Sequence, residues 1–171
     1  QRQMCIRDRS QNNGSVMVDG GDGGSGGGDG GSGGGDGGDG GNENPNFTGF
    51  GLAIQDMTVD QGDEICLDVV AYNFTDILGL QYTITYDASV LQFSSISNTN
   101  LAGLSPNSFG NPSPGVITMS WSDPNATGIS VDDGTVIFEL CFTVTGSTST
   151  TVSFGNSPTP IEVIDSGLNE I

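Results

Sequence analysis

Hydrophobic and polar residues alternate along positions 47–171 with the two-residue period of half-buried β-strands. Turns rich in Asp, Gly and Asn separate the alternating segments at roughly the 8–12-residue spacing that is typical of all-β domains. No segment has the period of a long amphipathic helix. The hydrophobic positions define segments at 50–54, 65–71, 80–86, 90–93, 117–121, 136–144 and 152–154, with a weaker one at 161–163. The pattern predicts an all-β, two-sheet sandwich.

Two of these segments have a clear inner and outer face. Alternation directs one set of side chains toward the core: Tyr82, Ile84, Tyr86, Ile117, Met119 and Trp121. The opposite set is uncharged and rich in hydroxyl groups: Gln81, Thr83, Thr85, Thr118, Ser120 and Ser122. Such a flat polar face is either a docking surface or an ordinary solvated sheet face.

The segment before the sandwich has a different composition. Residues 20–41 contain 16 Gly, 4 Asp and 2 Ser and nothing else. This composition predicts a flexible, disordered Gly/Asp linker over residues 20–46. Calcium-binding Gly/Asp repeats of the β-roll type need a large apolar residue in each repeat, and this tract has none.

The charge distribution excludes many functions. The chain has 21 acidic residues, 3 basic residues and no His, and all three basic residues lie within residues 1–9. We interpret residues 1–9 as a translated sequencing adapter, with a genuine basic N-terminus as the alternative. Without cations, the remainder is not expected to bind nucleic acid or anionic lipid. It also lacks the residues for a Ser-His-Asp triad, a catalytic Lys or a zinc site built on His.

Other predictions of function are also negative. No apolar run reaches the ~18–20 residues that a membrane span needs, so we expect no membrane insertion. Glycosidase chemistry needs only two carboxylates. However, nothing in the sequence brings outward-facing carboxylates such as Asp68 and Glu139 together in a cleft, and we expect no enzyme.

Three motifs resemble those of cohesin domains. They are Val59–Ile65, Gly79–Asp87 followed by Val90 and Leu91, and Asp133–Val136 leading into Cys141–Val144. The resemblance implies a jelly-roll sandwich related to cellulose-binding modules. It further implies a non-catalytic, secreted module that binds a dockerin-like protein in a scaffold or cell-surface assembly, with a relation to polysaccharide degradation. The acidic, Asn/Ser/Thr-rich style resembles secreted proteins of Bacteroidetes.

The resemblance also implies where a partner would bind. Cohesins bind dockerins through one sheet face, which here comprises Gly79, Gln81, Thr83, Thr85, Thr118, Ser120 and Ser122. Family members tend to carry Asn and Asp where this chain has Gly79 and Gln81, so recognition by the familiar residues is open. One alternative is a carbohydrate-binding module, although Trp121 faces inward and only Tyr72 among the tyrosines faces outward. The other alternative is a structural spacer repeat of a large adhesin.

Cys66 and Cys141 lie in the middle of their predicted strands. An extracellular setting favours a disulfide between them. The cohesin resemblance implies instead that their strands belong to opposite sheets, which would keep outward thiols apart. Both alternatives stay open.

No organic cofactor is expected, but two loops carry oxygen ligands that suit calcium. One holds Asp56, Asp60 and Asp63, and the other holds Asp123, Asn125 and Asp132. The alternative is that these side chains bond backbone groups in ordinary turns.

The resemblance predicts an exchanged strand. Cohesins end in a strand of roughly the form Asn-Gly-Ser-Val-x-Val, which is due just beyond Ile171, yet residues 13–18 have that form. We interpret residues 10–19 as the last strand of a preceding module and residues 47–171 as a sandwich without its own last strand. Ser15–Val18 is predicted to fill the vacant edge beside Phe50–Ile54, because an unpaired sheet edge favours strand addition.

Removal of residues 10–18 is therefore expected to lower the melting temperature, measured by circular dichroism on the full and the truncated chain. An unchanged melting temperature would show that this segment does not complete the sandwich.

Overall fold

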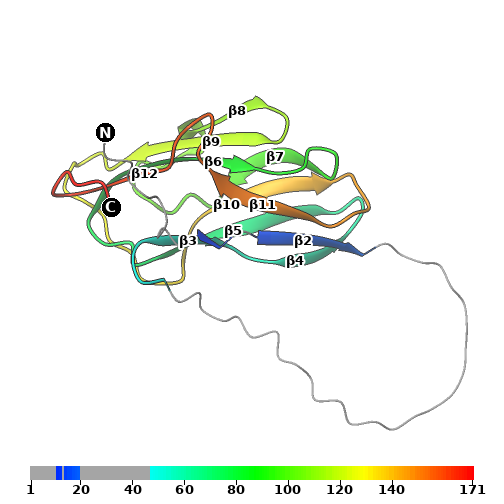
Figure 1. Ribbon diagram of the computed structural model, residues 1–171, viewed down its shortest axis with the longest axis horizontal. Helices are drawn as coiled ribbons and strands as arrows, with labels where there is room; N and C mark the ends of the chain where they lie inside the picture. Colours follow the sequence, from blue (N-terminus) through cyan, green and yellow to red (C-terminus); the bar gives the residue numbers. More distant parts are fainter. Residues whose placement is uncertain (1–10, 13, 20–46) are drawn as a thin grey trace, which may run out of the picture.

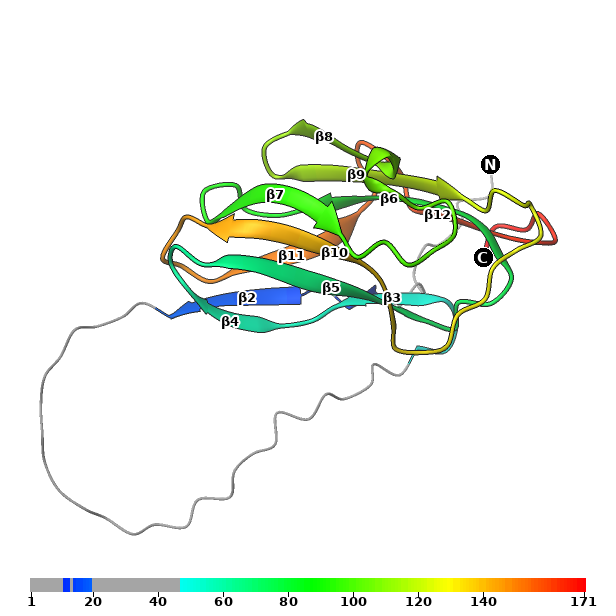
Figure 2. The same cartoon turned by 180° about the vertical axis from the view of Figure 1, so that it is seen from behind.

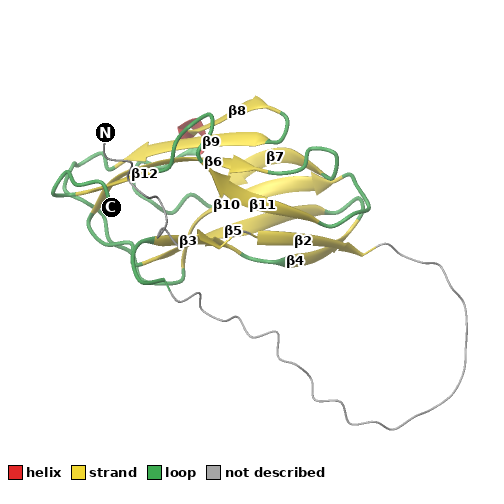
Figure 3. Cartoon of the chain, in the orientation of Figure 1, coloured by secondary structure: helices red, strands yellow, loops and turns green. Residues whose placement is uncertain are grey.

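Two β-sheets pack face to face in the computed structural model (Figure 1). The structure describes residues 11, 12, 14–19 and 47–171. The adapter-like segment and the predicted linker lie outside the described residues. Strands dominate the described part, and its only helical element is a short 3₁₀ turn at Pro106–Ser108 (Figure 3). The prediction of an all-β two-sheet sandwich is confirmed.

The strands divide between the sheets as follows. The first sheet has the order β1-β3-β5-β10-β7, comprising Gln11–Asn12, Gly51–Ile54, Glu64–Tyr72, Thr135–Val144 and Leu91–Ser97. The second has the order β4-β2-β11-β6-β9-β8, comprising Met57–Asp60, Gly14–Asp19, Thr150–Gly155, Ile77–Thr85, Val116–Ser122 and Phe109–Ser113. β12 (Glu162–Asp165) also pairs with β6. Figure 2 shows the same two layers from behind.

The side chains predicted to face inward form the core between the sheets. Tyr82, Ile84 and Ile117 are fully buried, and Trp121 is 5% exposed. The Trp121 indole N–H donates to the carbonyl of Ala102 at 2.8 Å, which satisfies the one polar group of that ring. Edge-to-face ring contacts link the two layers, for example Tyr86 with Phe142 at a centroid distance of 5.0 Å.

The N-terminal strand β2 is an integral part of the sandwich. It pairs in parallel with β4 and antiparallel with β11, so both of its edges are bonded. Val16 is fully buried and Val18 is 9% exposed, whereas Met17 between them is 50% exposed. The alternation is that of a strand with one face in the core.

The predicted position of this strand beside Phe50–Ile54 is wrong. Ser15–Val18 lies beside β4 and β11, and the short β1 pairs with Leu52 and Ala53 instead. The reason is a break in the strand pattern at Gln55 and Asp56, both exposed, which separates β3 from β4. Residues before the break belong to the first sheet and residues after it to the second.

We expect Val16→Ala to lower the free energy of unfolding by about 2 kcal/mol, because it removes buried methyl groups and leaves a cavity. Met17→Ala is the matched control on the solvent side of the same strand, with an expected change within about 0.5 kcal/mol. Urea unfolding of both variants measures the difference. Equal effects would contradict the docked position of β2.

Candidate functional site

The seven predicted face residues lie together on two adjacent strands. In the antiparallel pair β6–β9, Gly79 lies opposite Ser122, Gln81 opposite Ser120 and Thr83 opposite Thr118. Thr85 follows on the same face, opposite Val116. Two-residue alternation therefore placed these residues on the same side of two paired strands, which we call the β6–β9 face.

One member of this set is not accessible. Thr83 is fully buried because the segment between β11 and β12 crosses over it. The Thr83 hydroxyl donates to the Thr159 carbonyl at 2.8 Å and accepts from the Thr159 amide at 2.9 Å. The prediction that Thr83 belongs to an open face is wrong, because a loop distant in sequence covers it.

The remaining part of the face has a small hollow of about 130 Å³. Gly79, Gln81, Ser120, Glu162 and Ile164 are among the residues that border it. The Gln81 amide donates to a Glu162 carboxylate oxygen at 2.8 Å, which holds both side chains at the rim. The absence of a side chain at Gly79 helps to keep the hollow open. Sequence reasoning missed Glu162, since β12 gives only a weak strand signal.

The two candidate carboxylates are neighbours after all. Asp68 on β5 lies directly opposite Glu139 on β10. The sequence-based expectation that nothing places them together is wrong, because it lacked the pairing of these strands. Glu139 accepts hydrogen bonds from the Ser97 hydroxyl at 2.7 Å and the Asn98 amide at 2.9 Å, so it is held by the sheet. Partial burial, and then the charge of Glu139, raise the pKa of Asp68.

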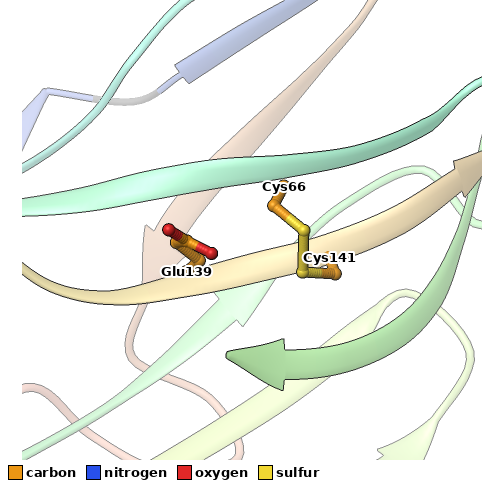
Figure 4. A group of neighbouring side chains, drawn as sticks. All are labelled: Cys66, Glu139 and Cys141. Carbon is orange, nitrogen blue, oxygen red and sulfur yellow. A yellow bond between two sulfur atoms is a disulfide. The ribbon is translucent and has the colours of Figure 1, made fainter. Parts of the chain in front are cut away.

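A disulfide joins Cys66 and Cys141, with an S–S distance of 2.05 Å (Figure 4). The two residues are register partners on the adjacent strands β5 and β10. The expectation that their strands belong to opposite sheets is therefore wrong. Within the described part of the chain, these sulfurs and Glu139 form the one group of three potential metal ligands within 4.8 Å. Because the sulfurs are bonded to each other, the group is a disulfide beside a carboxylate.

The two candidate calcium loops have local hydrogen bonds. An Asp63 carboxylate oxygen accepts the Asp60 amide at 2.9 Å. The Asp123 carboxylate accepts the amides of Asn125, Thr127 and Gly128. These bonds, first that of Asn125, lower the pKa of Asp123. The bond from the Asn125 amide to Asp123 is that of an Asx turn, and calcium binding stays an untested prediction.

The described surface offers no aromatic platform for a sugar. Tyr72 lies on the outer side of β5 but is 9% exposed, because Phe47 packs on it at a ring-centroid distance of 5.1 Å. The exposed large hydrophobic residues of the described chain are Met17, Leu168 and Ile171, none of them aromatic. Carbohydrate stacking is thus not favoured on the surface that the structure describes.

We expect Asp68→Asn to raise the free energy of unfolding at pH 7 by about 0.5 kcal/mol, because it removes like charges from a cross-strand pair. The folded-state pKa of Asp68 lies above its ordinary value of 3.8, so the charged form costs stability above the folded-state pKa. That cost disappears as the pH falls below the unfolded value. The gain is therefore expected to vanish in acid, as followed by urea unfolding at several pH values.

Glu64→Gln is the matched control for this variant. It removes the same charge from the same strand, opposite the neutral Thr143. An equal gain in both variants would show that net charge, and not the Asp68–Glu139 pair, determines the effect.

None of the described residues belongs to a helix with the length and hydropathy that a membrane crossing requires. A search among curated protein sequences gave no match.

Solved structures with a similar fold include several cohesins. The sixth cohesin of scaffoldin B from Acetivibrio cellulolyticus, in complex with a dockerin, is 22% identical at a TM-score of 0.60 over 72% of this chain and 92% of that chain. A cohesin–dockerin complex from Clostridium thermocellum is 19% identical at 0.58, over 72% and 91%. A non-cellulosomal cohesin from Archaeoglobus fulgidus is 21% identical at 0.57, over 72% and 83%.

The family model for the cohesin domain matches residues 50–170, which is most of the chain and nearly all of its sandwich. The match agrees with the jelly-roll arrangement of the sheets and with the motifs on β4, β6 and β10. This chain belongs to the cohesin domain family.

Proposed function

We propose that this cohesin docks a dockerin-type protein through the β6–β9 face, as part of an extracellular scaffold for polysaccharide breakdown. The observation that carries the proposal is the uncharged polar surface of Gly79, Gln81, Ser120 and Ser122 on the adjacent strands β6 and β9, where the family resemblance implies partner binding. Family membership makes the chain a non-catalytic protein-interaction module. Its related structures from Acetivibrio cellulolyticus and Clostridium thermocellum contain dockerins as partners.

The chemistry of the face supports recognition by hydrogen bonds. Gln81, Ser120 and Ser122 offer amide and hydroxyl groups, and Glu162 at the rim of the hollow offers a carboxylate. A partner side chain that enters the hollow would therefore be a hydrogen-bond donor. With a net charge of −18, the chain attracts a basic partner surface, and this attraction raises the association rate mainly at low salt.

Two features bear on the location and the role of the module. The Cys66–Cys141 disulfide supports an oxidising, extracellular compartment. The link to polysaccharide breakdown rests on the family resemblance. Retention of the chain on insoluble polysaccharide would favour a carbohydrate-binding role instead.

Pull-down with the immobilised full chain tests the proposal, using the secreted proteins of the source organism with calcium or with a chelator. We expect calcium-dependent capture of a protein with paired EF-hand-like loops, identified by mass spectrometry. Binding of that purified partner is then measured by calorimetry. No capture under either condition would favour a structural spacer and contradict the proposal.

Matched variants locate the binding surface. Ser120→Arg places a long cation in the middle of the β6–β9 face and is expected to weaken binding at least tenfold. Ser95→Arg is the control, since Ser95 is exposed on β7 and pairs with Cys141 in the other sheet. Loss of binding in the Ser95 variant alone would place the partner on the opposite sheet.

A further inference from the structure

Strand β2 is hydrogen-bonded along both edges, but it is far in the sequence from both of the strands that it pairs with. Its register partners are residues 57–60 on β4 and residues 150–152 on β11. Val16 and Val18 belong to the main core cluster, together with Val59 and Val152 from the two flanking strands. We call the position between β4 and β11 the strand-acceptor site. A strand in this site is held by backbone pairing with β4 and β11 and by the burial of Val16 and Val18.

The direction of β2 requires a long return connection. Because β1 and β2 run parallel to β3 and β4, Gln11 lies beside Leu52 and Asp19 lies beside Asp60. The chain must therefore pass back along the whole length of residues 51–60 before β3 can begin. At ~3.3 Å per residue this distance is about 30 Å.

The length and composition of the connecting sequence predict a span that matches this distance. Residues 20–46 comprise 27 residues, of which only Pro45 has an aliphatic side chain and none is aromatic. Their composition predicts a root-mean-square span of about 29 Å. A connection of this span would allow β2 to enter the acceptor site of its own sandwich. It would equally allow β2 to enter the acceptor site of a second copy at a similar distance.

We propose that the strand-acceptor site takes the Gly14–Asp19 strand of a second copy of this chain as well as its own, so that neighbouring copies are joined by strand exchange. The contacts are the same in both arrangements, and only the connectivity differs. A connection with this predicted span would give the chain's own strand an effective concentration in the millimolar range. A dilute copy is therefore self-completed, and exchange requires copies that are crowded or held together.

Disulfide trapping in the full chain tests this exchange. Met17 and Thr58 are register partners, and both are exposed. Two variants, Met17→Cys and Thr58→Cys, each also carrying Cys5→Ser, are unfolded together in urea without reductant, which preserves the Cys66–Cys141 disulfide. They are refolded at about pH 5, where thiols stay protonated, and then oxidised. Total concentrations run from about 10 μM to about 1 mM.

We expect a heterodimer linked through positions 17 and 58, identified by peptide mass spectrometry, whose yield rises at least tenfold across this range. The double variant Met17→Cys/Thr58→Cys is expected to form the link within one chain in dilute solution. Ser122→Cys replaces Thr58→Cys in the control mixture, because Ser122 is exposed on the distant strand β9. A yield no higher than that of the control would overturn the proposal, as would failure of the double variant to form its link.

A second measurement uses an acceptor site without its own strand. Val16→Asp places a charge at a fully buried position and is expected to displace β2. A labelled peptide of residues 11–19 should then bind this variant at least tenfold more tightly than the unaltered chain, by fluorescence anisotropy. Equal, weak binding to both folded proteins would contradict an accessible acceptor site. If the variant does not fold, the trapping experiment alone decides.

Discussion

Backbone hydrogen bonding at the edges of β4 and β11 is the constraint on which this sandwich depends. Without a strand between them, both edges would present unpaired N–H and C=O groups, and Val59 and Val152 would lose cover on one side. β2 satisfies both edges at once and closes this side of the two layers. The other side stays more open, since a hollow of about 530 Å³ lies between the outer strands β7 and β8, bordered by Phe93 and Asn111.

Alternation in the sequence predicted the faces of the strands but not their neighbours. The inward position of Trp121 and the outward position of Ser120 follow from a local two-residue period, which holds in any sandwich. Strand pairing is set by contacts far apart in the sequence, so the adjacency of β5 and β10 was not accessible. That single missing fact explains both the disulfide and the Asp68–Glu139 pair.

Two other features were out of reach for different reasons. Gln55 and Asp56, the exposed polar residues before β4, are also compatible with a continuous strand. The sequence therefore did not predict that the chain passes from the first sheet to the second at this point. The burial of Thr83 depends on a loop more than 70 residues away, which brings backbone groups to the hydroxyl. Hydrophobic patterns do not encode such polar contacts.

Hydrogen bonds from neighbouring residues stabilise several carboxylates in the part of the chain that the structure describes. Asp87 accepts the Ser89 hydroxyl and amide, and Asp165 accepts the Asn169 amide and side chain. In both cases hydrogen bonding lowers the pKa of the carboxyl group. Turns thus use the charge of Asp for local order.

The hydrogen bonds between Thr83 and Thr159 attach a loop to the middle of the β6–β9 face. The sheet forms the flat base of this surface. The loop that crosses it forms a raised part, because its backbone is hydrogen-bonded to a residue in the middle of the sheet. The outer residues of the loop, such as Asn156 and Pro160, are exposed and contribute little to the core. Changes in that loop can therefore reshape the surface while the sandwich beneath it is preserved, which is how rigid β-scaffolds diversify their specificity.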